Sequence, residues 1–204
     1  INCGLCLKKC EVLKENTSRK NDFETECFVA WMRDEEKIKM SSSGGMFFAL
    51  AEKFIEDGGY VAGAVYTDDF RGVKTIVTND IEEVKKMRGS KYFQSDKGNV
   101  FSETKNLLEK GEKVFFSASP CECGALSAFL GKDYENLITQ DIICHGVPSP
   151  KVWKKYIGLC ERKANSNTKK VFFRHKINGW KDFSLYVGFE NNKLVMEEKG
   201  SVHG

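Results

Sequence analysis

The stretch SSSGGMFFALAEKFIEDGGYVAGAVY, residues 41–66, decides how this chain folds. Its apolar residues recur at helical spacing from Met46 onward, which predicts a helix that Gly58-Gly59 ends. The serines before that helix predict N-terminal caps from the hydroxyls of Ser42 and Ser43. The apolar run over residues 60–66 then predicts a strand, so the stretch places a helix next to a strand.

The same alternation continues along the chain. We predict further strands over residues 73–78, 114–118 and 137–143, and helices over residues 81–87, 100–110, 125–130 and 151–163. In the last helix, Val152, Trp153, Tyr156 and Ile157 are predicted to face inward. Alternating strands and helices favour an α/β fold, a mixed sheet flanked by helices, with α+β as the alternative.

The part of the chain before residue 41 has a different composition. Residues 1–22 are polar and cysteine-led, and residues 23–40 are predicted to be a connector. The charged run at residues 33–37 is predicted to be a solvated turn. The side chains predicted to anchor the connector are Phe28, Val29, Trp31 and Met32.

The α/β domain is predicted to cover residues 41–163, and residues 164–204 begin a β-rich region that is incomplete at Gly204. Strands are predicted there over residues 170–175, 183–189 and 194–197, with a hairpin at Asn191-Asn192.

Composition narrows the classes of partner. The chain has 204 residues, with 32 basic and 29 acidic side chains and a net charge of +3. This small net charge gives no argument that nucleic acid or an anionic membrane is the main binding partner. No apolar run approaches the roughly 20 residues that span a bilayer. Eight cysteines in a lysine-rich chain favour metal or redox roles over disulfides, and therefore a cytoplasmic location. Cys27 and Cys160 are predicted to be packed thiols.

Three cysteines open the chain at the spacing C-x2-C-x3-C, namely Cys3, Cys6 and Cys10. The spacing fits the last three places of the bacterial ferredoxin run, whose thiolates hold a 4Fe–4S cluster. A zinc site or chance thiols are the alternatives. The first cysteine of that run would precede Ile1, so we expect a fragment that binds the cluster poorly while the full protein binds it well.

Two polar segments could face a ligand. Ser41–Gly45 opens a helix, where amides and the helix dipole suit a phosphate or pyrophosphate, although a plain helix cap is the alternative. Arg88–Ser95 combines cations, hydroxyls and an amide with Tyr92 and Phe93, which could stack on a flat ring. A surface loop is the alternative for that segment.

Two more polar segments, Ser117–Gly124 and Gln140–Ser149, follow predicted strands, the place where open α/β sheets bind ligands. The first holds Cys121 near a helix N-terminus, where a thiolate is favoured. Because both segments lie at strand ends, they predict a shared crevice. A hydrolase or transferase that uses Cys121 and His145 is one alternative function, and a zinc-stabilised interaction module is another.

Together these segments resemble the coenzyme F420 hydrogenase/dehydrogenase beta-subunit family. The residues that carry the resemblance occur in order: Ser42–Gly45, Gly58-Gly59, Arg88–Tyr92 with Gln94 and Ser95, Ser119–Cys121, and Asp141–Ser149. Where that family has Thr-Pro-Cys-Gln, this chain has Ser119-Pro120-Cys121-Glu122.

The resemblance implies an iron–sulfur flavoprotein that passes electrons between 4Fe–4S clusters and FAD in residues 41–163, and between FAD and coenzyme F420 or an unidentified substrate. It implies a redox partner such as a ferredoxin, hydrogenase or dehydrogenase subunit. The cofactor-binding residues that it implies are Ser42, Ser43, Gly44, Gly45, Lys91, Tyr92, Gln94, Ser95, Ser119, Pro120 and Cys144. Those implied at the reaction centre are Cys121, Asp141 and His145.

Overall fold

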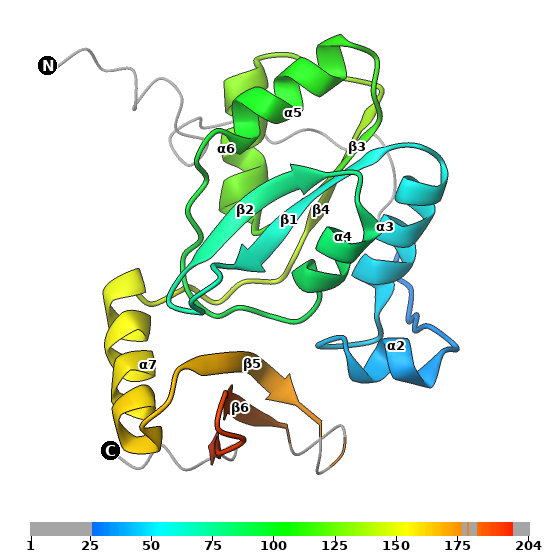
Figure 1. The fold of residues 1–204 in the computed structure, drawn as a ribbon. Coiled ribbons are helices and arrows are strands. Elements are labelled where there is room, and N and C mark those ends of the chain that lie inside the picture. The colour runs from blue at the N-terminus through cyan, green and yellow to red at the C-terminus, as the bar shows by residue number, and fades with distance from the viewer. Residues whose placement is uncertain (1–25, 177–178, 180–182, 198–204) are drawn as a thin grey trace, which may run out of the picture.

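The computed structural model describes residues 26–176, 179 and 183–197 of the chain (Figure 1). Its elements are α2 (Glu35–Lys39), α3 (Met46–Glu56), β1 (Tyr60–Tyr66), β2 (Val73–Thr78), α4 (Ile81–Met87), α5 (Val100–Glu109), β3 (Val114–Ala118), α6 (Pro120–Leu130), β4 (Leu137–Asp141), α7 (Pro150–Ala164), β5 (Thr168–His175), β6 (Ser184–Phe189) and β7 (Leu194–Glu197). The predicted α/β class, a mixed sheet flanked by helices, is confirmed. The predicted cluster segment 1–22 lies outside the described residues.

The first sheet has the strand order β2-β1-β3-β4. Strands β1, β3 and β4 are parallel, with Ala62 paired to Phe116 and Ala118 paired to Asp141. Strand β2 joins β1 antiparallel. The carboxyl ends of the three parallel strands therefore meet at one edge of the sheet.

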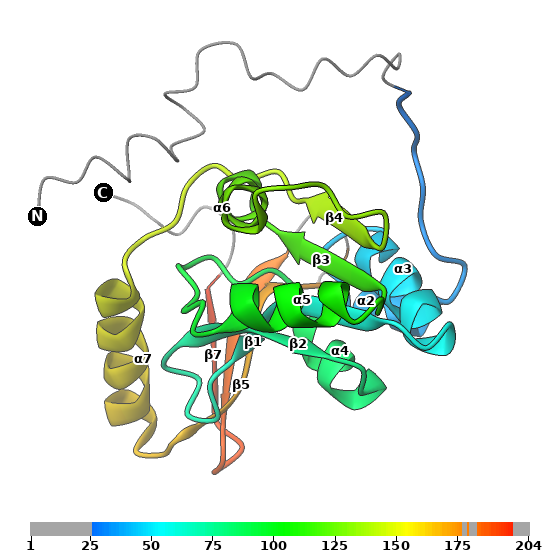
Figure 2. The same ribbon diagram turned by 90° about the horizontal axis from the view of Figure 1, so that it is seen from above.

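Helices cover both faces of this sheet (Figures 1 and 2). On one face, Val61 and Phe115 pack with residues of α3 and α4. On the other, Ala62 and Phe116 pack with residues of α5 and α6. Successive residues of a strand point to opposite faces, so the continuous apolar runs of β1 and β3 require helices on both sides.

A second sheet, of order β5-β6-β7, is antiparallel. It shares a core with α7 and with the ends of β1 and β2, where Trp153 and Ile157 pack with Val171 and Val187. The Trp153 indole also donates a hydrogen bond to the Phe70 carbonyl, 2.8 Å away. The second sheet therefore lies at the carboxyl end of β1 (Figure 1). The predicted hairpin at Asn191-Asn192 joins β6 to β7.

Two helix starts and one strand end differ from the sequence prediction. Residues 33–37 are not a solvated turn, because the Asp34 carboxylate accepts hydrogen bonds from two backbone amides and starts α2. The helix predicted from Ala125 starts at Pro120, where Ser119 and Glu122 form a capping box around a proline in the first turn. The strand predicted to end at Ile143 ends at Asp141.

The cap of α3 also differs. The hydroxyls of Ser42 and Ser43 do not cap it; its N-cap is Gly45, at φ +85°, a left-handed conformation that glycine adopts at little cost. Gly44 is required for close approach, because a Cβ there would lie 2.6 Å from the Ala30 carbonyl oxygen.

The connector is less well anchored than predicted. Phe28, Val29 and Trp31 are exposed, and Met32, half-buried, is tied to the Gly44 carbonyl by its backbone amide. Two further predictions of burial are wrong, since Cys27 and Val152 are exposed, while Cys160 is buried as predicted.

Replacing Phe115 with alanine tests the first core. Phe115 is fully buried, with the rings of Phe47 and Phe54 6.1 and 5.4 Å away. We expect Phe115→Ala to lower the free energy of unfolding by about 3–5 kcal/mol, measured by denaturant titration. The matched control is Phe28→Ala, at an 81 % exposed side chain, with an expected change below about 0.5 kcal/mol. Equal effects of the two substitutions would contradict the assignment of the core.

Candidate functional site

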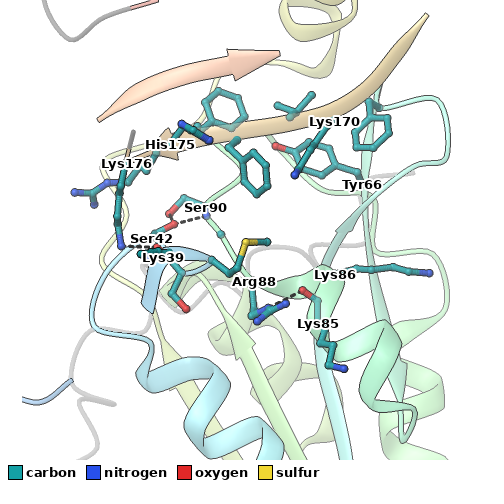
Figure 3. Close-up of a pocket in the computed structure, with 18 of the residues that line it drawn as sticks. Lys39, Ser42, Tyr66, Lys85, Lys86, Arg88, Ser90, Lys170, His175 and Lys176 are labelled. Atoms are coloured by element: carbon teal, nitrogen blue, oxygen red, sulfur yellow. Dashed lines mark hydrogen bonds between the residues drawn. The ribbon is translucent and has the colours of Figure 1, made fainter. Parts of the chain in front are cut away.

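A cavity of about 810 Å³ lies at the carboxyl end of β1 (Figure 3). Its walls are the segment from α2 to Ser42, the residues that end β1 and follow it, the carboxyl end of α4, and strand β5. Open α/β sheets bind their ligands at this end of the parallel strands. The volume is within the range of about 300–1,000 Å³ that is usual for ligand pockets.

Basic side chains dominate the cavity wall. Seven lysines and arginines line it against two acidic residues, Glu36 and Asp68; the basic residues are Lys39, Lys85, Lys86, Arg88, Lys170, Arg174 and Lys176. Three of them pair with carboxylates of their own helices, as Lys39 does with Glu36 at 2.7 Å. Within the described part of the chain, Arg88, Lys170 and Arg174 form no ion pair, so their charge remains available to an anion.

Arg88 is held in place without neutralisation. Its guanidinium lies 4.6 Å from the centre of the Phe48 ring, and its Nε donates to the Lys85 carbonyl at 3.1 Å. Burial lowers the pKa of Arg88, and Glu52 and Glu82 oppose that shift. The guanidinium therefore remains a cation at neutral pH.

Lys176 ties β5 to the segment before α3. Its ammonium donates to the carbonyls of Ile38 at 3.1 Å and Ser41 at 2.6 Å, with Ser43 further away at 3.4 Å. Burial and the nearby Arg174 lower the pKa of Lys176. These bonds join the end of β5 to the segment between α2 and α3 at one side of the cavity, on the left in Figure 3.

The first two predicted ligand segments meet in the cavity wall. The Ser42 hydroxyl accepts hydrogen bonds from the Ser90 amide at 2.5 Å and the Ser90 hydroxyl at 2.8 Å. Of the serine-glycine segment, only Ser41 and Ser42 line the cavity. Gly45 lies against Met32, whose sulfur would be 2.8 Å from a Cβ at that position. A phosphate-binding role for Ser43, Gly44 and Gly45 stays a prediction.

Lys91 lies behind the cavity wall. Its ammonium donates to the carbonyls of Met87 at 3.0 Å and Gly89 at 3.2 Å, and also contacts that of Arg88, so it caps the carboxyl end of α4. Burial lowers the pKa of Lys91 to about 7. Tyr92 is half-exposed, with its ring edge-on to Phe173 at 5.2 Å.

Ser95 belongs to a second polar cluster. Its hydroxyl is 2.9 Å from the Thr75 hydroxyl and accepts a hydrogen bond from Lys97. Lys97 also forms an ion pair with Glu122, whose other oxygen accepts from the Ser119 amide at 3.3 Å. This cluster therefore connects the predicted segments 88–95 and 117–124. Gln94 is exposed.

The pairing of β3 with β4 brings together the first residues of the predicted segments 117–124 and 140–149. The Ser117 hydroxyl donates a hydrogen bond to the Gln140 side chain at 2.9 Å. Burial, together with Asp141, raises the pKa of the Cys123 thiol to about 12. Beyond Asp141 the segment is exposed, Cys144 and His145 included. Cys121, after Pro120, is exposed and contacts Ser119, with 3.2 Å between sulfur and oxygen. This contact is not the cysteine–histidine pair that a hydrolase would need.

In the described part of the chain, no three histidine, cysteine, aspartate or glutamate side chains gather in a way that could hold a metal ion. Cys3, Cys6 and Cys10 lie outside that part, so the cluster prediction is untested. A bilayer-crossing segment is likewise absent from the helices that the structure describes.

Sequence reasoning missed Lys97 and the basic residues of β5. Lys97 could have been found, because it follows Ser95 by two residues within one polar segment. Lys170, Arg174 and Lys176 carry no local signal, since the chain brings them to Ser41 and Ser42 from more than 120 residues away.

The fold and the cavity define the class of the protein, an α/β protein with a basic ligand cavity at the carboxyl end of a central strand. Residues 27–101 match the family model described as coenzyme F420 hydrogenase/dehydrogenase, beta subunit N-terminal region. This match confirms the resemblance that the motifs indicate.

The fold has a solved relative. A chain of the xenon-derivatised F420-reducing [NiFe] hydrogenase complex from Methanosarcina barkeri aligns with a TM-score of 0.55 and 20 % identity, over 83 % of this chain. The alignment covers 60 % of that chain, so this chain spans less than two thirds of its length. The comparison establishes a shared fold. No curated protein sequence matches this chain.

Replacing Lys91 with methionine tests its burial. The folded pKa of about 7 lies below the unfolded value near 10.4, so as the pH rises from about 7 to about 8.5 the unfolded chain comes to hold up to one more proton than the folded chain. The free energy of unfolding should therefore rise with pH in this window, by up to about 1.4 kcal/mol per pH unit.

Lys91→Met should lose that rise in denaturant titrations at about pH 7 and about pH 8.5. The control is Lys105→Met, on the exposed side of α5, which should keep it. The same pH dependence in wild type and Lys91→Met would show that Lys91 remains charged in the folded protein.

Proposed function

We propose that this chain is the flavin-binding part of an iron–sulfur flavoprotein oxidoreductase and that FAD occupies the basic cavity at the end of β1. The observation that carries the proposal is the wall of that cavity, where seven basic side chains stand against two acidic ones. FAD joins a flat ring system to a pyrophosphate, and arginine and lysine are the side chains that bind phosphate oxygens best. The family match supports the proposal, because three of the four wall segments lie within residues 27–101.

Different residues of the wall suit the two parts of FAD. Arg88, whose guanidinium forms no ion pair among the described residues, would hold the pyrophosphate, with the hydroxyls of Ser42 and Ser90 on the same wall (Figure 3). The aromatic residues of the wall would contact the flat ring; they are Tyr66, Phe70, Phe172 and Phe173. The cavity thus offers charge and flat apolar surface to one ligand.

The bound flavin would supply the conversion between single electrons and a hydride. Cys3, Cys6 and Cys10 would hold iron of a 4Fe–4S cluster that exchanges single electrons. Two electrons and one proton make one hydride, so the hydride partner would be a two-electron carrier. Coenzyme F420, which the family description names, is our first candidate, and a ferredoxin, hydrogenase or dehydrogenase subunit would be the redox partner. The 117–124 and 140–149 segments contribute no residue to the wall of this cavity, so a role for Cys121, Asp141 and His145 at the reacting ring stays a prediction.

Replacing Arg88 with glutamine tests the phosphate end. We expect Arg88→Gln to weaken FAD binding about tenfold or more, because a charge-assisted hydrogen bond is lost. Quenching of flavin fluorescence during titration of the 204-residue chain measures the affinity. The matched control is Arg162→Gln, at an exposed site on α7, which should leave it unchanged. Failure of the wild-type chain to bind FAD would refute the assignment of the cavity.

The cluster assignment has its own test. Anaerobically purified intact gene product should contain iron and acid-labile sulfide and show broad visible absorbance beneath the flavin bands. Combined replacement of Cys3, Cys6 and Cys10 by serine should remove the iron and leave the flavin, whereas Cys27→Ser should keep both. Zinc without sulfide in the wild-type protein would support the interaction-module alternative instead.

A further inference from the structure

The hydroxyl of Tyr66, a residue of the cavity wall, is buried without a hydrogen-bond partner among the described residues. Folded proteins leave few such groups unpaired, because each one costs stability. Seven side-chain atoms in the described part of the chain are in this condition, and three belong to residues of the cavity wall, namely Tyr66, Arg174 and His175. Of these three groups, the Tyr66 hydroxyl is a donor that a polar ligand of the cavity could pair.

The ring of Tyr66 is held from several sides. It packs 5.4 Å from the Phe70 ring and 6.2 Å from the Phe93 ring, and the Lys91 ammonium lies 5.4 Å from its centre. Burial raises the pKa of Tyr66 well above its usual value, so the phenol is neutral and can donate a hydrogen bond. A fixed ring with a neutral donor at its tip suits recognition of a specific acceptor atom.

Tyr66 also lies where its side chain could contact the ring of a ligand in the cavity. It is the last residue of β1, at the carboxyl edge of the sheet. In Figure 3 it lies beside Lys170 and across the cavity from Ser42 and Arg88. The hydroxyl is closed from solvent, so a ligand reaches it when a neighbouring flexible side chain such as Lys170 moves aside.

We propose that Tyr66 is the residue that binds the ring end of the ligand, donating a hydrogen bond from its hydroxyl to a carbonyl oxygen or ring nitrogen at the edge of the flat ring system. The proposal rests on the proposed function, since it takes the ligand to be a flavin. It fixes the orientation of that ligand, with the ring at Tyr66 and the phosphates at Arg88.

Tyr66→Phe removes the hydroxyl and keeps the ring. In the 204-residue chain we expect about tenfold weaker binding of FAD and of riboflavin, and unchanged binding of ADP, which lacks the ring system. Without ligand, the melting temperature should rise by about 2–4 °C, because an unpaired buried hydroxyl is lost. The melting temperature is measured on the chain without any bound cofactor.

Tyr134→Phe is the matched control. Tyr134, between α6 and β4, is the other tyrosine in the described part whose hydroxyl is buried and unpaired, and it is not a residue of the cavity wall. Its replacement should raise the melting temperature in the same way and leave the affinities for FAD, riboflavin and ADP unchanged.

The possible outcomes distinguish the role of Tyr66 from the proposed function on which it rests. If the wild-type chain binds FAD and Tyr66→Phe binds it equally well, the role of Tyr66 is refuted and the proposed function stands. If the wild-type chain binds no flavin, both the proposed function and the role of Tyr66 are refuted. A lower melting temperature of ligand-free Tyr66→Phe would show that the hydroxyl serves the fold, and would also refute its role at the ring.

Discussion

Strands β1 and β3 are apolar on both faces, and the arrangement of the other elements follows from the need to cover those faces. Val61 and Phe115 require α3 and α4 on one side, and Ala62 and Phe116 require α5 and α6 on the other. With both faces covered, the edge where the parallel strands end is the place left for polar groups. The second sheet attaches at that same edge, and the cavity lies between the two sheets.

The sequence predicts this first sheet well because the information is local. Strands 60–66 and 114–118 are mostly apolar runs, preceded by Gly59 and Lys113, and both have the bounds predicted for them. The two helix starts that were missed were also local. Asp34 and Ser119 both precede acidic residues suited to a first turn, but one segment was assigned to a charged turn and the other to a ligand loop. In both cases the capping chemistry outweighed the polar composition.

The basic wall could not be predicted in the same way. Lys176 bonds to the Ser41 carbonyl across 135 residues, and nothing in the sequence around β5 identifies it as part of a site. The motifs revealed half of the wall, through Ser42 and Arg88, and the second sheet supplies the other half. A site between two sheets becomes visible when the tertiary arrangement is known.

The polar motif residues occupy two places. Ser42, Arg88 and Ser90 are in the cavity wall, while Ser95 joins Lys97 and Glu122 in the second cluster. The segment 88–97 passes through both, so it connects the cavity with the amino end of α6 and with Cys121. At position 122 the family that the motifs resemble has glutamine, whereas this chain has Glu122. Lys97 forms an ion pair with Glu122 and neutralises the added charge.

The hydrogen bonds of Lys176 have a mechanical consequence. One side chain at the end of β5 holds the carbonyls of the segment before α3, and Ser42 of that segment holds Ser90. The two sheets therefore cannot change their angle without disturbing the wall that faces the ligand. By thermodynamic reciprocity, a ligand that favours one width of the cavity also favours one orientation of the second sheet. Any contact made by the far side of β6 and β7 would be coupled to occupancy of the cavity through the shared core and through the Lys176 ammonium.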